Sequence, residues 1–302
     1  MSLSSILRLR EVRERFKVDF PKPKLTLSGE ILAVPTHPST SHAALVGTSF
    51  DYLMRLQVEM LNPGKTRSRR WVAESALARL ASAVKSGVPV FPPDSNRSTR
   101  GLVSKAQRIV SDARDEYLKC LAVGRVSDDM IKGAVLLGQL EQFYRSLTLS
   151  ETFGRVPPKA IADLKGLLKV AKQSMGCFRA KRLCALNPHF GKASELVEGA
   201  DADILVDDTL IEVKTTKLLE FTAEMFRQLI GYYTLHSIAR SQPRIRAIAV
   251  YFARYGVFRR LEIESIVDSR KFPEFKRWFV KFLKDRQAPR LICTVDGVEV
   301  WG

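Results

Sequence analysis

Apolar and polar positions change their period along this chain, and the clearest change lies in residues 198–217, EGADADILVDDTLIEVKTTK. Two apolar runs of strand length, residues 202–206 and 209–213, flank the pair Asp207 and Asp208. Short apolar runs on either side of two turn-forming residues are typical of a tight β-hairpin, which we therefore predict here. Three charged residues are expected only on its solvated face: Asp207, Asp208 and Lys217.

The alternation of side chains along the hairpin decides which of its charged residues can meet. One face of the first strand carries Asp201, Asp203 and Leu205, and one face of the second carries Leu210, Glu212 and Lys214. Carboxylates and lysine are depleted from strand interiors, so Asp203, Glu212 and Lys214 stand where β propensity disfavours them. Residues that break a local rule in this way often serve a function.

The two acids and the lysine suggest a particular chemistry. Two carboxylates presented together can hold a hard divalent cation, and Mg2+ typically uses one or two carboxylates with water and substrate phosphate. A lysine beside the cation can orient or help to deprotonate a water and offset charge that develops on phosphorus. Asp203 and Glu212 are therefore candidate ligands of Mg2+ or Mn2+, and Lys214 is the candidate catalytic lysine. The alternative is a solvated charged face with incidental salt bridges.

Helical periodicity follows the hairpin. In residues 222–240 apolar side chains recur at three- and four-residue spacing, with Thr222 as the expected N-cap. Gln228 and Tyr232 are four residues apart and share one face of this helix. Two further strands are expected after it, at residues 245–252 and 257–266. Strands interrupted by a helix predict an α/β fold.

The chain before the hairpin is patterned mainly as helices. A loop at residues 35–41 leads into a helix at residues 45–60, which Pro63 and Gly64 end. Four later segments show the same helical spacing: residues 70–84, 102–121, 127–147 and 158–174. The loop at residues 87–101 between them is rich in Pro, Ser and Gly.

Basic amphipathic segments are expected at both ends of the chain. Residues 2–24 predict a short basic helix ended by Pro21 and Pro23, which could contact phosphate or a membrane, or only expose a solvated face. Residues 273–286 predict a second such helix, with its aromatic side chains packed on the core. Residues 290–301 are expected to add an edge strand.

Composition and charge narrow the class of protein. The chain has 302 residues, of which 45% are hydrophobic, enough for one large or two modest domains with a buried core. The net charge of +17 suits a polyanionic partner. No apolar run approaches the roughly 20 residues that span a bilayer, and no secretory signal is apparent, so we expect a cytoplasmic protein without a membrane partner. The four cysteines lack the spacing of a zinc module.

The order Asp203, then Glu212-Val213-Lys214 on the following strand, resembles the signature of the PD-(D/E)XK nuclease superfamily. Gln228 and Tyr232 match the Gln-x-x-x-Tyr motif that follows the catalytic lysine in the RecB-like branch of that superfamily. The resemblance implies that these two residues position the lysine or the substrate. It also implies a core of strands, a helix and further strands, preceded by a helix that carries Gly-x-x-x-His.

Residues Gly47 and Asp51 have the spacing of that upstream motif, with aspartate in place of histidine. Because the family's histidine is a metal ligand and aspartate can also bind a metal, the resemblance makes Asp51 a third candidate ligand. An ordinary acid on a helix surface is the alternative for Asp51. Glu198 is a lesser candidate. Some RecB-like exonucleases hold an iron–sulfur cluster, but only Cys293 follows the motifs here, so no cluster is expected.

Together these features predict an α/β protein with a PD-(D/E)XK, restriction-endonuclease-like core, a mixed central sheet flanked by helices. The core would comprise residues 41–62 and 186–270, with a basic segment at 1–40, a helical insertion at 63–185 and a basic helix with a possible strand at 271–302. The expected function is metal-dependent hydrolysis of duplex or single-stranded DNA, most similar to RecB-like exonucleases. Alternatives are an RNA-directed nuclease and a noncatalytic nucleic-acid-binding or assembly protein. The sequence does not identify protein partners.

Overall fold

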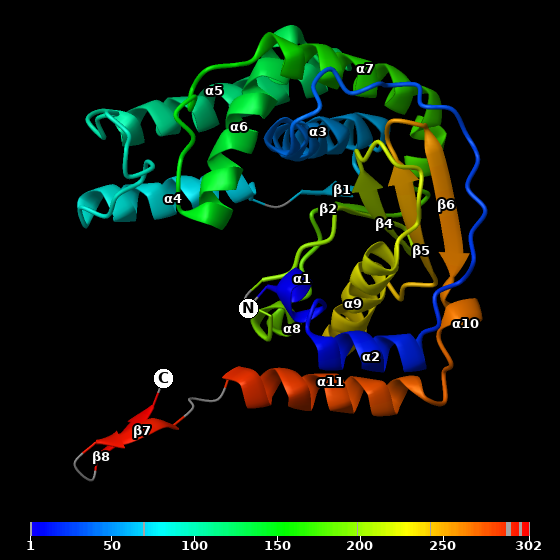
Figure 1. Ribbon diagram of the computed structural model, residues 1–302. Helices are drawn as coiled ribbons and strands as arrows, with labels where there is room; N and C mark the ends of the chain where they lie inside the picture. The colour runs from blue at the N-terminus through cyan, green and yellow to red at the C-terminus, as the bar shows by residue number, and fades with distance from the viewer. Residues whose placement is uncertain are drawn as a thin grey trace.

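The computed structural model describes residues 2–68, 70–197, 199–241, 243–287, 291–295 and 298–301. Within these residues the protein is an α/β protein, with a six-stranded mixed sheet and a large helical part that lies mainly in the N-terminal half (Figure 1). Among the described residues, none of the helices combines the length and the apolar composition of a transmembrane segment.

The main sheet has its strands in the order in which they occur along the chain, from β1 to β6. Their bounds are Thr66–Arg67, Cys184–Leu186, Ile204–Val206, Thr209–Lys214, Ala247–Phe252 and Val257–Glu262. The pairs β1–β2 and β4–β5 are parallel, whereas β2–β3, β3–β4 and β5–β6 are antiparallel. The parallel step from β4 to β5 is made through helix α9 (Ala223–Ala239), as a crossover connection requires.

The predicted hairpin is β3 and β4. Leu205 pairs with Leu210 and Val206 with Thr209, so the turn consists of Asp207 and Asp208. Asp207 adopts a positive φ of 51°, a conformation that aspartate tolerates better than most residues.

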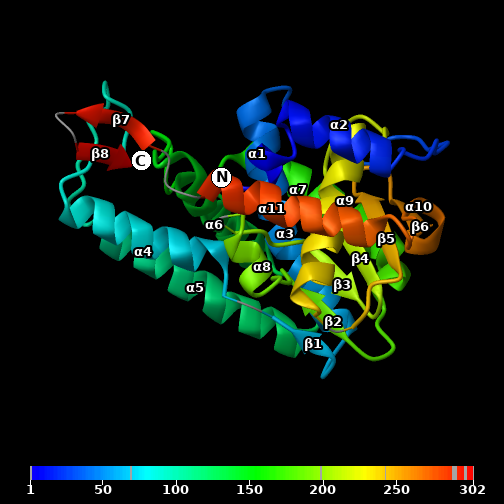
Figure 2. The same cartoon turned by 90° about the horizontal axis from the view of Figure 1, so that it is seen from below.

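Helix α3 (Thr40–Leu61) covers one face of the sheet together with the helices that follow it (Figure 1). These are α4 (Val72–Lys85), α5 (Leu102–Val123), α6 (Asp128–Ser146) and α7 (Pro158–Ser174), close to the bounds predicted from their periodicity. Their apolar side chains share one core with the sheet residues Ile204, Ile211, Ala249 and Tyr251. Figures 1 and 2 show the pair α4 and α5 extending past the sheet.

The opposite face of the sheet is covered by α9, by α8 (Lys192–Glu195) and α10 (Ile263–Ile266), and by helices near both ends of the chain (Figure 2). The helices near the ends are α1 (Leu3–Ile6), α2 (Arg10–Asp19) and α11 (Phe272–Gln287). The rings of Phe16 on α2 and Phe275 on α11 meet edge to face, with centroids 5.0 Å apart. This second core takes Leu205, Leu210 and Val250 from the sheet, so the strand alternation divides the hydrophobic residues between two layers.

Several predicted elements differ in the structure. The single N-terminal helix is two helices, α1 and α2, and α3 begins at Thr40 inside the predicted loop. The strand predicted at 257–266 ends at Glu262, and the rest of it forms the helical turn Ile263–Ile266, in which the N–H of Val267 donates to the carbonyl of Ile263. The short strand β1 and the start of β2 lie inside the predicted helical insertion.

The predicted edge strand at the C-terminal end was also wrong. Strands β7 (Leu291–Val295) and β8 (Val298–Trp301) pair antiparallel with each other in a separate two-stranded sheet. The sequence between them is Asp296-Gly297, a dipeptide that favours a local hairpin over pairing with a distant strand.

A buried ion pair connects the helical layer to the sheet. Arg254, just after β5, lies 2.7 Å from the Asp163 carboxylate of α7, and both side chains are almost completely buried. The same guanidinium donates to the carbonyl of Thr215, directly after β4, and to the carbonyl of Ala33. His42 of α3 lies 3.3 Å from Asp163. These contacts fix α7 and α3 relative to the end of β4.

Candidate functional site

The predicted acids and lysine gather where β3 and β4 lie side by side. Asp203 immediately precedes β3, and the register that pairs Ile204 with Ile211 continues to bring it beside Glu212. Its carboxylate accepts a hydrogen bond of 2.7 Å from the backbone N–H of Val213. This bond holds Asp203 against the strand that carries Glu212 and Lys214.

Lys214 is held between two partners. Its Nζ donates to Glu212 Oε1 at 2.6 Å and to Gln228 Oε1 of α9 at 3.0 Å. The Nε2 of Gln228 in turn donates to the hydroxyl of Tyr232, also at 3.0 Å. A chain of hydrogen bonds therefore runs from β4 into α9, in which Gln228 contacts Lys214 directly and Tyr232 contacts Gln228.

Burial changes the ionisation of these groups. It raises the pKa of Glu212 from its ordinary value of 4.5 to about 7, an effect that the nearby charge of Asp203 increases and that of Lys214 opposes. It also raises the pKa of Asp203, against the effects of Lys214 and the Val213 N–H. Burial alone would lower the pKa of Lys214, but the charges of Glu212 and Asp203 raise it overall. Lys214 is therefore an ammonium ion at neutral pH.

Helix α3 passes close to the end of β4. A Cβ atom added to Gly47 would lie 3.1 Å from the hydroxyl of Thr215, the residue after Lys214, so a larger side chain at Gly47 would crowd this approach. Asp51 lies one turn further along α3, 21% exposed, and forms an ion pair with Arg55 on the following turn. The glycine of the predicted Gly-x-x-x-Asp motif therefore has a packing role beside the site.

Arg55 is the main residue at this site that the sequence analysis did not identify. Its side chain is buried, and burial lowers the pKa of Arg55 overall. The charges of Glu141, Asp203 and Asp201 act in the opposite direction. Glu141 comes from α6 and accepts a hydrogen bond of 3.0 Å from the hydroxyl of Tyr52. The spacing of four between Asp51 and Arg55 could have suggested their ion pair. Nothing local in the sequence indicates Glu141.

The donor set fits a hard cation in part. Glu212 Oε2 and Asp51 Oδ1 are buried and have no hydrogen-bond partner among the described residues, which leaves two carboxylate oxygens able to bind a cation. Asp203 and Glu212 are adjacent, as predicted. However, no group of three Asp, Glu, His or Cys side chains in the described part of the chain is placed to share one ion. The role of Asp51 as a third ligand stays a prediction.

The remaining predicted residues lie elsewhere. Glu198, the lesser ligand candidate, is outside the described residues. Asp207, predicted to be simply solvated, accepts hydrogen bonds from the backbone N–H groups of residues 181–183, at 2.8 to 3.1 Å. Partial burial alone would raise the pKa of Asp207, but these three bonds lower it overall. Asp207 therefore organises the chain that enters β2. Lys217 is exposed, as expected.

Comparison with protein-family models, with curated proteins and with solved structures found no match.

Proposed function

We propose that the protein is a divalent-metal-dependent nuclease that hydrolyses phosphodiester bonds in DNA. The observation that carries the proposal is the position of the Lys214 ammonium group, held by Glu212 and Gln228 next to the carboxylate of Asp203. Two adjacent carboxylates can hold a cation, and a fixed ammonium group can offset charge that develops on a phosphate. The net charge of +17 supports a polyanionic substrate.

The order of the elements supports the same proposal. Helix α3, then β2, β3 and β4, then α9 and β5, is the arrangement implied by the resemblance to RecB-like PD-(D/E)XK nucleases. The close approach of α3 to Thr215 at Gly47, and the hydrogen bond from Gln228 to Tyr232, add support at the positions of the two helix motifs.

Each residue has a distinct role in this proposal. Asp203 and Glu212 would hold Mg2+ or Mn2+, with Asp51 as a third candidate ligand; the bound cation would supply Lewis-acid polarisation of the scissile phosphate. Lys214 keeps its proton on Nζ, so it orients water and offsets charge and does not act as the base. Gln228 fixes the position of the ammonium group, and Tyr232 fixes the amide of Gln228.

The test is an assay of the purified protein on linear, circular, single-stranded and duplex DNA, and on RNA, with Mg2+, Mn2+ or a chelator. Metal-dependent cleavage of DNA is expected, and cleavage of linear but not circular DNA would indicate an exonuclease of the RecB-like type. Cleavage of RNA alone would indicate the RNA-directed alternative. Binding without cleavage under every metal condition would overturn the nuclease proposal and favour a noncatalytic nucleic-acid-binding or assembly protein.

A further inference from the structure

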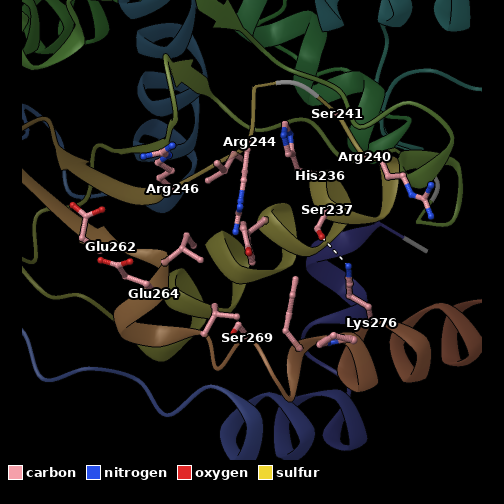
Figure 3. Close-up of a pocket in the computed structure, with 16 residues that line it drawn as sticks. His236, Ser237, Arg240, Ser241, Arg244, Arg246, Glu262, Glu264, Ser269 and Lys276 are labelled. Carbon is pink, nitrogen blue, oxygen red and sulfur yellow. Dashed lines mark hydrogen bonds between the residues drawn. The ribbon is translucent and has the colours of Figure 1, made fainter.

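A cavity of about 730 Å³ opens at the other end of the sheet from Lys214 (Figure 3). It lies between the C-terminal half of α9, the residues before β5, α10 and the start of α11. The parallel strands β4 and β5 pair Lys214 with Phe252 at one end, whereas the N–H of Arg246 donates to the carbonyl of Asp208 at the other. The length of a six-residue strand, roughly 20 Å, separates the two places.

Four basic side chains line this cavity: Arg240, Arg244, Arg246 and Lys276. Within the described part of the chain, none of the three guanidinium groups forms an ion pair, whereas the lining acid Glu262 is paired with Arg260. His236 also lines the cavity, and its ring nitrogen Nε2 lies 2.8 Å from the carbonyl of Pro243. Burial lowers the pKa of His236, so the ring is neutral at pH 7. The cavity therefore offers unpaired positive charge.

The lining side chains divide into two regions (Figure 3). Arg244 extends into the middle of the cavity, and Lys276 reaches from α11 to donate a hydrogen bond of 3.1 Å to Ser237 Oγ. On the other side lie Arg246 and two carboxylates that accept hydrogen bonds, those of Glu262 and Glu264. One region of the cavity thus suits an anion, and the other suits hydroxyl or amino groups.

We propose that this cavity binds a phosphate-bearing ligand of nucleotide size. Guanidinium and ammonium groups are the side chains that best bind phosphate oxygens, and Arg244 with Lys276 and the hydroxyl of Ser237 would supply them. The carboxylates of Glu262 and Glu264 would accept hydrogen bonds from sugar hydroxyls or base amino groups. The volume falls within the range of about 300–1,000 Å³ that holds small ligands and exceeds the needs of a single inorganic ion. None of the residues that line the cavity belongs to the site around Lys214.

The phosphate can come from a free nucleotide or from the end of a nucleic-acid strand, and the probes distinguish the two. Calorimetric titration at low ionic strength would use ATP, pyrophosphate, a 5′-phosphorylated oligonucleotide and the same oligonucleotide without the phosphate. The protein would carry Lys214→Ala, so that cleavage neither occurs nor matters to the result. Binding of ATP or pyrophosphate identifies a free ligand. Preference for the phosphorylated oligonucleotide, without binding of ATP, identifies a strand end.

The site is assigned by paired variants. Arg244→Gln with Lys276→Gln removes the two central charges and should weaken binding of the phosphate ligand about tenfold or more. The control, Arg108→Gln with Arg125→Gln, removes two exposed arginines outside the cavity and should leave binding unchanged. Because Lys276 also contacts Ser237, a second test uses Arg240→Gln with Arg244→Gln, two arginines whose side chains form no hydrogen bond within the described part of the chain. Absence of binding by every probe, or equal loss in cavity and control variants, would overturn the proposal.

Discussion

The ammonium group of Lys214 lies 2.6 Å from the carboxylate of Glu212, on the next residue but one of the same strand. The contact is mostly buried, since the Glu212 side chain is 5% exposed and that of Lys214 is 23% exposed. The charge of each group favours the ionised form of the other, in a place where burial favours the neutral forms. Removal of either charge should therefore change the ionisation of the other group.

Replacement of Lys214 should affect cleavage but not metal binding. Lys214→Ala is expected to lower the cleavage rate at least about a hundredfold, because the group that offsets charge on the phosphate is lost. Metal binding should persist, since the carboxylates remain. The matched control is Lys217→Ala, an exposed lysine three residues away, which should cleave at the wild-type rate. Single-turnover rates measure cleavage, and the melting temperature with and without Mn2+, followed by circular dichroism, measures metal binding. Equal cleavage by Lys214→Ala and wild type would contradict the proposed role.

The raised pKa of Glu212 predicts a dependence of stability on pH in the metal-free protein. Since the folded pKa is about 7 and the ordinary value is 4.5, the folded state binds more protons between these values, and stability must fall as pH rises through that window. The loss is on the order of 3 kcal/mol. The Glu212→Gln variant should lack this component. Denaturant unfolding of both proteins from pH 4.5 to 8 measures it, and parallel pH profiles would show that Glu212 does not titrate there.

A bound cation should reverse this trend, because it favours the ionised carboxylates. Mg2+ or Mn2+ is expected to raise the melting temperature of the wild type more at pH 8 than at pH 5, and to do little for Glu212→Gln. The Ca2+ ion, which is larger and also binds oxygen ligands, serves as a comparison. A metal response that is independent of pH and of Glu212 would place the cation elsewhere.

Asp51 tests whether α3 contributes to the same site. Asp51→Asn should weaken both metal stabilisation and cleavage, whereas Asp51→His should retain more activity, because imidazole can bind a metal and the amide is a poor ligand. Both variants also deprive the buried Arg55 of its ion-pair partner, so metal-free stability should fall in each. The informative quantity is therefore the change in melting temperature on adding Mn2+. A wild-type change in both variants would make Asp51 an ordinary partner of Arg55.

The buried pair Arg254 and Asp163 predicts a large structural effect. Asp163→Asn should destabilise the fold by about 3–5 kcal/mol, because it leaves a buried guanidinium without a counter-charge. Asp129→Asn breaks an exposed pair with Lys132 and should change stability far less than Asp163→Asn does. Urea unfolding of both variants provides the measurement. Similar small effects would mean that the other hydrogen bonds of Arg254 are sufficient to hold it.

The high positive charge predicts how the protein binds nucleic acid without metal. Affinity for duplex DNA should fall at least about tenfold between roughly 50 and 200 mM salt, because counterions released from the phosphates drive binding. Fluorescence anisotropy with a labelled duplex measures the slope, and polyglutamate serves as a competitor that carries charge without phosphates. A titration insensitive to salt would remove nucleic acid as the natural partner.

The sequence alone determined the elements whose residues interact with near neighbours. Three- and four-residue spacing gave α4 to α7 and α9, and strict alternation placed Asp203, Glu212 and Lys214 on one face of a hairpin, since the period of a strand is fixed by its backbone. Gln228 and Tyr232 were likewise linked by helix geometry. These are short-range relationships, which local stereochemistry decides.

Only the tertiary structure decided which distant charges meet. Arg55 and Glu141 enter the surroundings of Asp203 because α3 and α6 pack together over the sheet. The cavity around Arg244 exists because α9, α10 and α11 meet at the start of β5. No periodicity of a single segment encodes such contacts, because they depend on how separate elements pack. The ionisation of Glu212 has the same origin, since its pKa is set by burial under α9 and by charges that folding brings together.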